Sequence, residues 1–211
     1  MIESSQRDKM SITKLKPEIN NTRKAGYPID PIFLNRWSPR AMSAESLTDD
    51  ELMPLFEAAR WAPSSFNAQQ RRFLYAKRAT QNWDVFFDLL SEGNKVWAKN
   101  AAVLVVVISR KNFEHNEKPS RTNMYDTGAA WENLALQGSL NSLVVHGMQG
   151  FDYEKARTAL NIPDHYEVCA MIAIGKKGRK EELPENLQKR EEPNGRRPLE
   201  EILIEGVFRG K

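Results

Sequence analysis

Apolar residues recur along this chain with the periods of both helices and strands. A helix is predicted to begin at Thr48, because Glu51 three residues later completes the pattern of a capping box. The apolar residues of this helix follow the spacing of one buried face, at Leu52, Leu55, Phe56 and Ala59. The same spacing predicts a second helix, with apolar residues at Trp83, Phe86, Phe87 and Leu90.

Two more helices are predicted further along the chain. The first runs from about Asp126 towards Leu143 and is rich in glycine and alanine, so a second helix can approach it closely. It carries little charge, which is typical of a helix that is buried nearly all round, for example at a subunit interface. The second follows Asp152, a good N-cap residue, and ends before Pro163.

Three segments are predicted to be strands: Arg72–Lys77, Val103–Ser109 and Val168–Gly175. The last two are continuously apolar and β-branched, so we expect helices to cover both of their faces. The alternation of helices and strands indicates a three-layer α/β or α+β domain.

The two ends of the chain have a different character. Residues 1–30 are polar and lack a steady apolar period, which indicates an arm that is disordered or lies on another surface. We therefore expect an N-terminal extension over residues 1–27 and a single domain over residues 28–211. Residues 181–197 are charged and contain Pro and Gly, so they are expected to form a surface excursion. Residues 199–204 are expected to form a last short helix or strand.

Composition and charge are those of a globular protein, with 40% hydrophobic and 28% charged residues. The net charge is only +3, and no aromatic residues alternate with the basic ones, so no nucleic-acid partner is expected. The longest apolar run, Val103–Ile108, is far shorter than the roughly 20 residues of a membrane helix, and no secretory signal is visible. The single cysteine, Cys169, is expected to be a small buried hydrophobe. These features suit a reducing cytoplasm and no membrane partner.

Standard catalytic motifs are missing from the sequence. It has no GxGxxG after a strand, no Walker loop, no HExxH and no GxSxG. The three histidines, His115, His146 and His165, are too far apart for a local metal motif and are interpreted as surface or turn residues. We therefore expect no metal site and no obligate catalytic side chain, so that any redox chemistry would come from a borrowed cofactor.

The first candidate binding segment is Asn35–Arg40, which also contains Trp37. Arg36 and Arg40 are four residues apart with the hydroxyl of Ser38 between them, an arrangement that suits a phosphate. A solvent-exposed basic turn is the alternative interpretation.

Further candidates follow along the chain. The segment Ala62–Gln69 offers the neutral donors and acceptors of two serines, an asparagine and a glutamine, although a capped turn explains the same residues. At Gly150, just before the N-cap Asp152, the backbone N–H can approach a ligand closely. Arg196 and Arg197 add positive charge in the tail.

In this order, the motifs resemble those of the FMN-dependent nitroreductase family. The resemblance spans roughly residues 28–204. It rests on Arg36, Ser38 and Arg40, then on Pro63, Ser64, Ser65, Asn67, Gln69 and Phe73, then on Gln149-Gly150-Phe151-Asp152, and finally on Arg196 and Arg197 before Pro198-Leu199.

The resemblance implies an α+β fold with a mainly antiparallel sheet flanked by helices, in an intertwined homodimer with FMN at the subunit interface. Arg36, Arg40 and the tail arginines would hold the phosphate and ribityl chain, and the Pro63–Asn67 segment would reach the flavin of the partner subunit. Gly150 would place its N–H near the flavin atom N5, with Gln149 and, through a looser alignment, Asn94 also at the flavin. The implied reaction passes hydride from NAD(P)H to a nitroaromatic, quinone or related electron-poor acceptor.

The sequence departs from the family pattern in three places. Gln70-Arg71-Arg72 replaces the usual Pro-Trp, Gln149 stands where glutamate is common, and residues 111–123 are short and polar where larger members carry substrate-covering helices. Three alternatives stay open: a flavin-binding sensor or store without fast turnover, a specialised oxidase or dehydrogenase on the same scaffold, and a basic interaction module without flavin.

Overall fold

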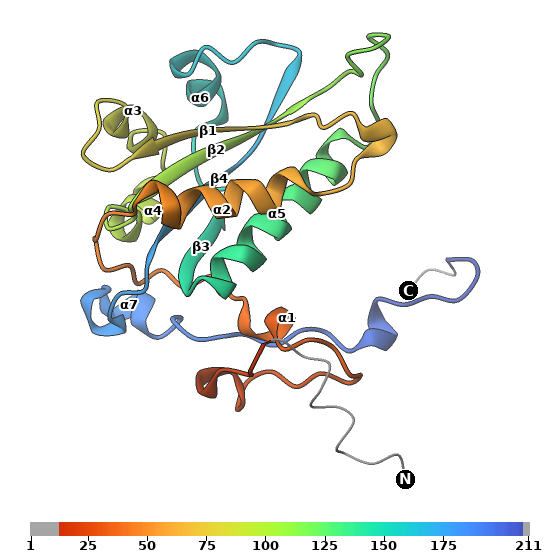
Figure 1. Ribbon diagram of the computed structural model, residues 1–211. Coiled ribbons are helices and arrows are strands. Elements are labelled where there is room, and N and C mark those ends of the chain that lie inside the picture. Colours follow the sequence, from red (N-terminus) through yellow and green to blue (C-terminus); the bar gives the residue numbers. More distant parts are fainter. Residues whose placement is uncertain (1–12, 209–211) are drawn as a thin grey trace. The chain divides into compact units, whose positions relative to one another are not determined.

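The computed structural model describes residues 13–208, which divide into two compact units. The larger unit spans Arg36–Glu191 and contains the sheet (Figure 1). In chain order its elements are α2 (Asp49–Arg60), η3 (Ser65–Asn67), β1 (Arg71–Lys77), α3 (Trp83–Phe87), α4 (Glu92–Ala98), β2 (Val103–Arg110), α5 (Asn123–Leu140), β3 (Leu143–Met148), α6 (Tyr153–Ala159), β4 (Tyr166–Lys176), η4 (Lys180–Glu182) and α7 (Glu185–Gln188).

The sheet has four strands in the order β1-β2-β4-β3, and every neighbouring pair is antiparallel. This confirms the expected α+β fold with a mainly antiparallel sheet. The three predicted strands are present as β1, β2 and β4, with ends that differ by one or two residues from the prediction. The central strand β2 pairs with β1 on one side and with β4 on the other.

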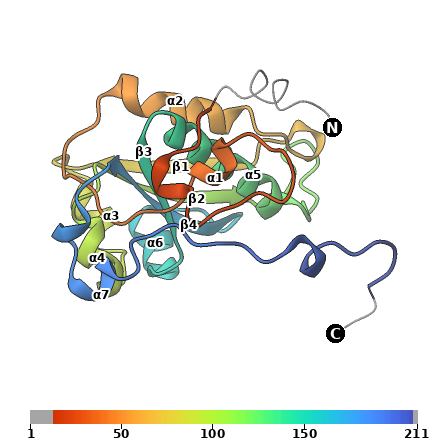
Figure 2. The same cartoon turned by 90° about the horizontal axis from the view of Figure 1, so that it is seen from below.

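Helices cover both faces of the sheet, as expected from the continuously apolar strands. Along β2, alternate residues contribute to two separate core clusters, with Val105 in one and Val106 in the other. The first cluster contains residues of α2 and α5, and the second contains residues of α3, α4 and α6. Figure 2 shows the same division, with α2 and α5 on one side of the sheet and α3, α4 and α6 on the other.

The predicted helix at Thr48 is confirmed as α2, including its capping box. The Glu51 N–H donates to the Thr48 hydroxyl at 3.2 Å, and the Thr48 N–H donates to the Glu51 carboxylate at 2.9 Å. The element nearest to Gly138 of α5 is a strand rather than the expected second helix, because a Cβ at Gly138 would lie 2.4 Å from the Val145 side chain of β3 and 3.4 Å from the Leu55 side chain of α2. The expected burial of α5 on all sides is not seen in the single chain, where Tyr125 is 82% exposed.

Strand β3 and helix α4, which both contribute to the core, were not predicted. Strand β3 follows α5 directly, because the helix ends at Leu140 and Ser142 turns the chain with a φ of 59°. The prediction instead extended the helix towards Leu143. Helix α4 was also missed, and the predicted helix through Leu90 ends earlier, as α3 at Phe87. The last predicted helix is confirmed as α6, with the Asp152 side chain accepting from the N–H of Lys155.

The segment after β4 is more ordered than the predicted surface excursion. It forms η4 and α7, and it buries Leu183 and Glu191. Leu183 belongs to the core cluster that contains α3, α4 and α6, so apolar packing as well as charge determines the path of this segment.

The smaller unit joins the two ends of the chain, Met1–Asn35 and Glu192–Lys211. Its described elements are η2 (Pro17–Ile19), α1 (Ile32–Asn35) and η5 (Leu199–Glu201). Arg23 connects the two ends by donating to the carbonyls of Leu34 and Asn194, each at 2.8 Å. The arm is therefore structured from Thr13 onwards, and the tail forms the short helix that was one of its two predicted forms. Residues 1–12 lie outside the described part of the chain.

Candidate functional site

Arg36, Ser38 and Arg40 form the first candidate segment, which leads into the larger unit. The Arg36 guanidinium donates to the Ser38 hydroxyl at 3.4 Å and forms an ion pair with Glu132 of α5 at 3.3 Å. It also lies 5.9 Å from the ring of Trp131. Within residues 13–208 the Arg40 guanidinium makes no hydrogen bond or ion pair, so its charge is available to a ligand.

A buried carboxylate holds the backbone of this segment. Glu191 is 8% exposed, and its Oε1 accepts hydrogen bonds from the N–H groups of Arg40 at 2.7 Å and Ala41 at 2.8 Å. Such charge-assisted bonds to main-chain N–H groups are stronger than neutral ones. This role of Glu191 was not predicted, because Glu191 lies in the charged segment 181–197 that was expected to form a surface excursion.

His146 of β3 contacts the same segment from another side. Its Nδ1 lies 2.9 Å from the Pro39 carbonyl, which can only accept, so Nδ1 carries the proton. Its ring packs against Trp97 with centroids 4.6 Å apart. Burial, together with the nearby charges of Arg40 and Arg36, lowers the pKa of His146 to about 4. The interpretation of His146 as a surface or turn residue is therefore wrong, and His146 is neutral near neutral pH.

Asn94 and Gly150, both candidates from the resemblance, lie in direct contact. The Asn94 side chain donates to the Gly150 carbonyl at 2.9 Å, and the N–H of Ser91 donates to the same carbonyl at 3.0 Å. The N–H of Gly150 donates to none of the described residues, so it is available to a ligand. A Cβ at position 150 would lie 2.7 Å from the Asn94 amide nitrogen, so a side chain there would have to displace the Asn94 amide.

A continuous series of contacts joins these two parts of the site. Trp97 donates from its indole N–H to the Asn94 side-chain oxygen at 3.3 Å. The Trp97 ring also packs against the ring of His146, which in turn hydrogen-bonds to the Pro39 carbonyl. The candidate segment Arg36–Arg40 and the Asn94–Gly150 contact thus belong to one region of the molecule. Trp97 and His146 were not predicted as site residues, although Trp97 stands three residues after Asn94, on the same face of a helix.

The segment Pro63–Asn67 makes its contacts elsewhere, at the start of α5. The N–H of Ser65 donates to the buried Asp126 carboxylate at 2.9 Å, and the Ser64 hydroxyl accepts from the N–H of Gln69 at 3.0 Å. Phe66 and Asn67 have φ values of 54° and 52°, a conformation that side chains rarely adopt, and Phe66 is 84% exposed. None of the hydrogen bonds made by this segment reaches Arg36–Arg40 within the described residues.

Arg196 and Arg197 belong to the smaller unit. Arg196 donates to the side chain of Asn194 at 3.0 Å and to the carbonyl of Gly195 at 2.9 Å. Arg197 is 80% exposed and lies 4.0 Å from Glu201. Both arginines are therefore accessible in the chain.

Gln149 and Cys169 line an apolar cavity of about 300 Å³, together with Trp131 and Thr127 of α5. Cys169 is the bulged residue of β4, since Val107 pairs with Ala170 while Ile108 pairs with Val168. The bulge leaves Cys169 half-buried, which corrects the expectation of full burial. Burial and Glu167 raise the pKa of its thiol to about 11, so a reactive thiolate is disfavoured as expected.

The described residues contain no group of histidine, cysteine and carboxylate side chains able to hold a metal ion. Among the same residues, no helix combines the length and the apolar character needed to cross a bilayer.

Comparison with known protein families identifies the family of this chain. The model of the nitroreductase family matches residues 34–176, which is most of the chain. The chain belongs to the nitroreductase family.

Known proteins show the same likeness. A solved structure described as an oxidoreductase containing FMN is 44% identical, covers 93% of this chain and 100% of its own, and has a TM-score of 0.87. A candidate nitroreductase from Desulfovibrio desulfuricans, solved in complex with FMN, has the same fold at 23% identity, with a TM-score of 0.66 and coverage of 85% and 99%. MhqN of Bacillus subtilis (strain 168), named as a candidate NAD(P)H nitroreductase, is 24% identical over 70% of this chain and 87% of its own length.

Proposed function

We propose that the protein is an FMN-dependent oxidoreductase that passes hydride from NAD(P)H to an electron-poor acceptor such as a nitroaromatic or a quinone. The relative at 44% identity is described as containing FMN, and MhqN is named for the use of NAD(P)H. Bound FMN would supply the hydride chemistry, and the side chains of this protein would bind, orient and tune it.

The observation that carries the proposal is the donor set around Arg36–Arg40. The Arg40 guanidinium and the Ser38 hydroxyl lie on a segment whose backbone is fixed by Glu191 and His146. Because His146 is neutral, the positive charge offered to a phosphate comes from the arginines alone. Arg196 and Arg197 of the tail would add to this charge.

The contact between Asn94 and Gly150 suits the flavin ring. The unpaired N–H of Gly150 offers a hydrogen bond to a ring nitrogen, and the Asn94 amide fixes the orientation of the Gly150 peptide. Gln149, which precedes Gly150 in the chain, is exposed and contributes an uncharged amide next to this contact.

We further propose a homodimer with the flavin between subunits. The segment Pro63–Asn67 makes none of its hydrogen bonds to Arg36–Arg40 within the described residues, and its Phe66 side chain is exposed, as expected of a segment that serves the partner's site. Exposed Tyr125 on α5 adds apolar surface next to it.

The first experiment is the absorption spectrum of the purified protein before and after anaerobic addition of NAD(P)H. A flavin spectrum that bleaches supports the redox enzyme, and one that does not bleach favours a sensor or store. Steady oxygen consumption without an added acceptor would favour a specialised oxidase. A protein that neither contains nor takes up FMN would refute the proposal.

The phosphate assignment is tested by the double variant Arg36→Ala, Arg40→Ala. Each charged hydrogen bond contributes about 1.5–3 kcal/mol, so the Kd for FMN should rise about 100-fold or more. The control is Arg179→Ala, Lys180→Ala, which removes two exposed positive charges from the loop after β4. Equal FMN affinity in the double variant and the control would refute the assignment.

A further inference from the structure

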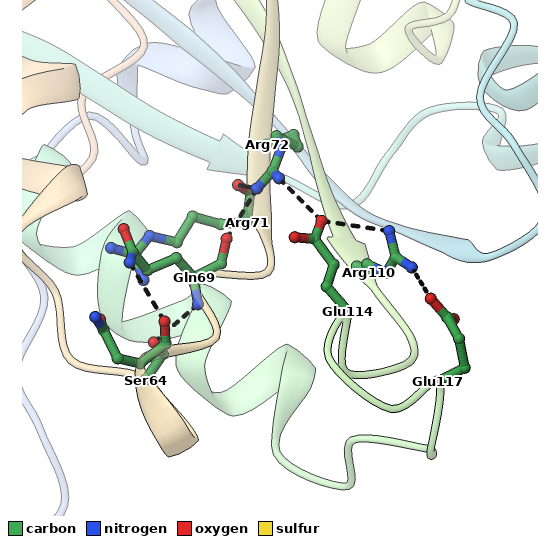
Figure 3. Close-up of polar contacts among 8 residues, drawn as sticks. Ser64, Gln69, Arg71, Arg72, Arg110, Glu114 and Glu117 are labelled. Atoms are coloured by element: carbon green, nitrogen blue, oxygen red, sulfur yellow. Dashed lines mark hydrogen bonds and ion pairs between the residues drawn. The ribbon is translucent and has the colours of Figure 1, made fainter.

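The start of β1 carries two arginines, Arg71 and Arg72, within the stretch Gln70-Arg71-Arg72 that replaces the usual Pro-Trp of the family pattern. Arg71 and Arg72 line a hollow of about 490 Å³, and the other lining residues include Asn67, Gln69 and Glu114. Figure 3 shows Arg72 between the segment that contains Ser64 and Gln69 and the loop that carries Glu114. The hollow therefore lies beside the segment that the proposed function places at the partner's flavin.

Arg71 is the deepest charged group of this hollow. The residue is only 7% exposed, and one end of its guanidinium donates to the Arg60 carbonyl at the end of α2. The other terminal nitrogen, Nη1, has no hydrogen-bond partner among the described residues. Asp126 attracts the Arg71 charge from the side of α5, but burial outweighs this attraction and lowers the pKa of Arg71. A buried guanidinium with an unmatched donor is costly unless a ligand or ordered water completes it.

The remaining charges around the hollow are mostly positive as well. The Arg72 side chain is 48% exposed; its Nη1 donates to the carbonyls of Gln69 at 2.8 Å and Arg71 at 2.9 Å, and its Nη2 forms a long ion pair to Glu114 at 3.6 Å. Glu114 is shared with Arg110 at 3.3 Å. Arg60 also lines the hollow, but Glu57 neutralises it. With Arg60 neutralised, the lining sets Arg71 and Arg72 against the single carboxylate of Glu114.

We propose that this hollow binds an oxyanion, a carboxylate or a phosphate, carried by a redox substrate of the enzyme. Arg72 contacts the anion directly, and Arg71 supplies fixed positive charge beneath it. This inference rests on the proposed function for the identity of the substrate as a redox partner. The position beside Asn67 and Gln69 means that the anion anchors a molecule whose reacting part lies at the flavin.

Two pairs of probes test the proposal, and the members of each pair differ by one oxyanion. 4-Nitrobenzoate and nitrobenzene represent the acceptor, and NADP⁺ and NAD⁺ represent the dinucleotide. Their Kd values are measured by ligand-observed NMR on the oxidised, FMN-loaded protein, where no turnover occurs. For at least one pair we expect the member with the additional oxyanion to bind more tightly, and the pair that shows this identifies the source of the oxyanion. The preference should shrink as salt is raised.

Three variants locate the effect. Arg72→Gln should reduce the preference about two- to fivefold, which is the range for a partly exposed ion pair. Glu114→Gln removes the opposing carboxylate and should increase the preference by a similar factor. Arg179→Gln, on the exposed loop after β4, is the control for net charge and should change nothing.

The outcomes separate this inference from the proposed function. No preference in either pair, or a preference that Arg72→Gln and Glu114→Gln leave unchanged, would overturn the oxyanion site even if the protein is a flavin enzyme. A protein that takes up no FMN would refute the proposed function, while the same titrations on that protein would still report the anion preference.

Discussion

Glu191 offers a direct test of how the candidate phosphate segment is held. Its buried carboxylate accepts from the N–H groups of Arg40 and Ala41 at 2.7 and 2.8 Å. In Glu191→Ala both N–H groups lose this acceptor, and an unsatisfied buried donor costs about 1–3 kcal/mol. Part of this cost is offset, because the carboxylate itself no longer has to be desolvated, and its Oε2 already lacks a partner among the described residues.

The net effect should be a loss of about 3 kcal/mol in the free energy of unfolding, which corresponds to about 6–12 °C in Tm for a domain of this size. Glu191→Gln keeps a neutral acceptor and should lose about half as much. The measurement is urea and thermal unfolding of the flavin-free protein, because bound FMN would add its own stabilisation. The exposed neighbour provides the control variant Glu192→Ala. Our account fails if Glu191→Ala is no less stable than this control.

Three further variants or measurements follow from the same region. Gly150→Ala places a Cβ 2.7 Å from the Asn94 amide nitrogen; it should displace that amide and weaken FMN binding about tenfold, about the loss of one hydrogen bond, as read by flavin titration. His146 has a pKa of about 4 when folded against 6.5 as its ordinary value, so the unfolded state binds more protons between these values. Stability should therefore fall by up to about 3 kcal/mol as the pH drops from 6.5 to 4; His146→Phe should remove this slope in pH-dependent unfolding, whereas His165→Phe should keep it. The Cys169 thiol, with a pKa of about 11 against 9.0, should be alkylated about 100-fold more slowly near pH 8 in the folded than in the unfolded protein, and equal rates would contradict its burial.

The fold was predictable where the apolar pattern was strong. Val103–Ser109 and Val168–Gly175 stand out because both of their faces are covered, so each reads as an unbroken apolar run. Strand β3 was not predicted because the apolar spacing continues from Leu140 to Leu143 and the positive φ falls on Ser142, a residue type that rarely adopts it. Helix α4 escaped because Gly93 and Asn94 are poor helix formers, and packing of Trp97 in the core compensates for them.

The candidate site was only partly predictable for a different reason. Its motif residues are recognisable as short local patterns, but the residues that hold them are remote in the chain. Glu191 lies 151 residues from Arg40, and His146 lies 107 residues from Pro39. Both side chains contact main-chain atoms, which every residue possesses. The sequence therefore contains no side-chain pattern that would predict either contact.

This use of main-chain contacts also explains the chemistry left to the arginines. Glu191 and His146 fix the path of Pro39–Ala41 through N–H and carbonyl groups, so the guanidinium of Arg40 is not consumed in shaping its own segment. Because its pKa is about 4, His146 is uncharged near neutral pH, so it fixes the backbone without adding positive charge of its own. A guanidinium stays charged throughout the physiological range. If this segment holds a phosphate, as proposed, its capacity to do so is set by geometry, because the conformation imposed by Glu191 and His146 positions the charge of Arg40.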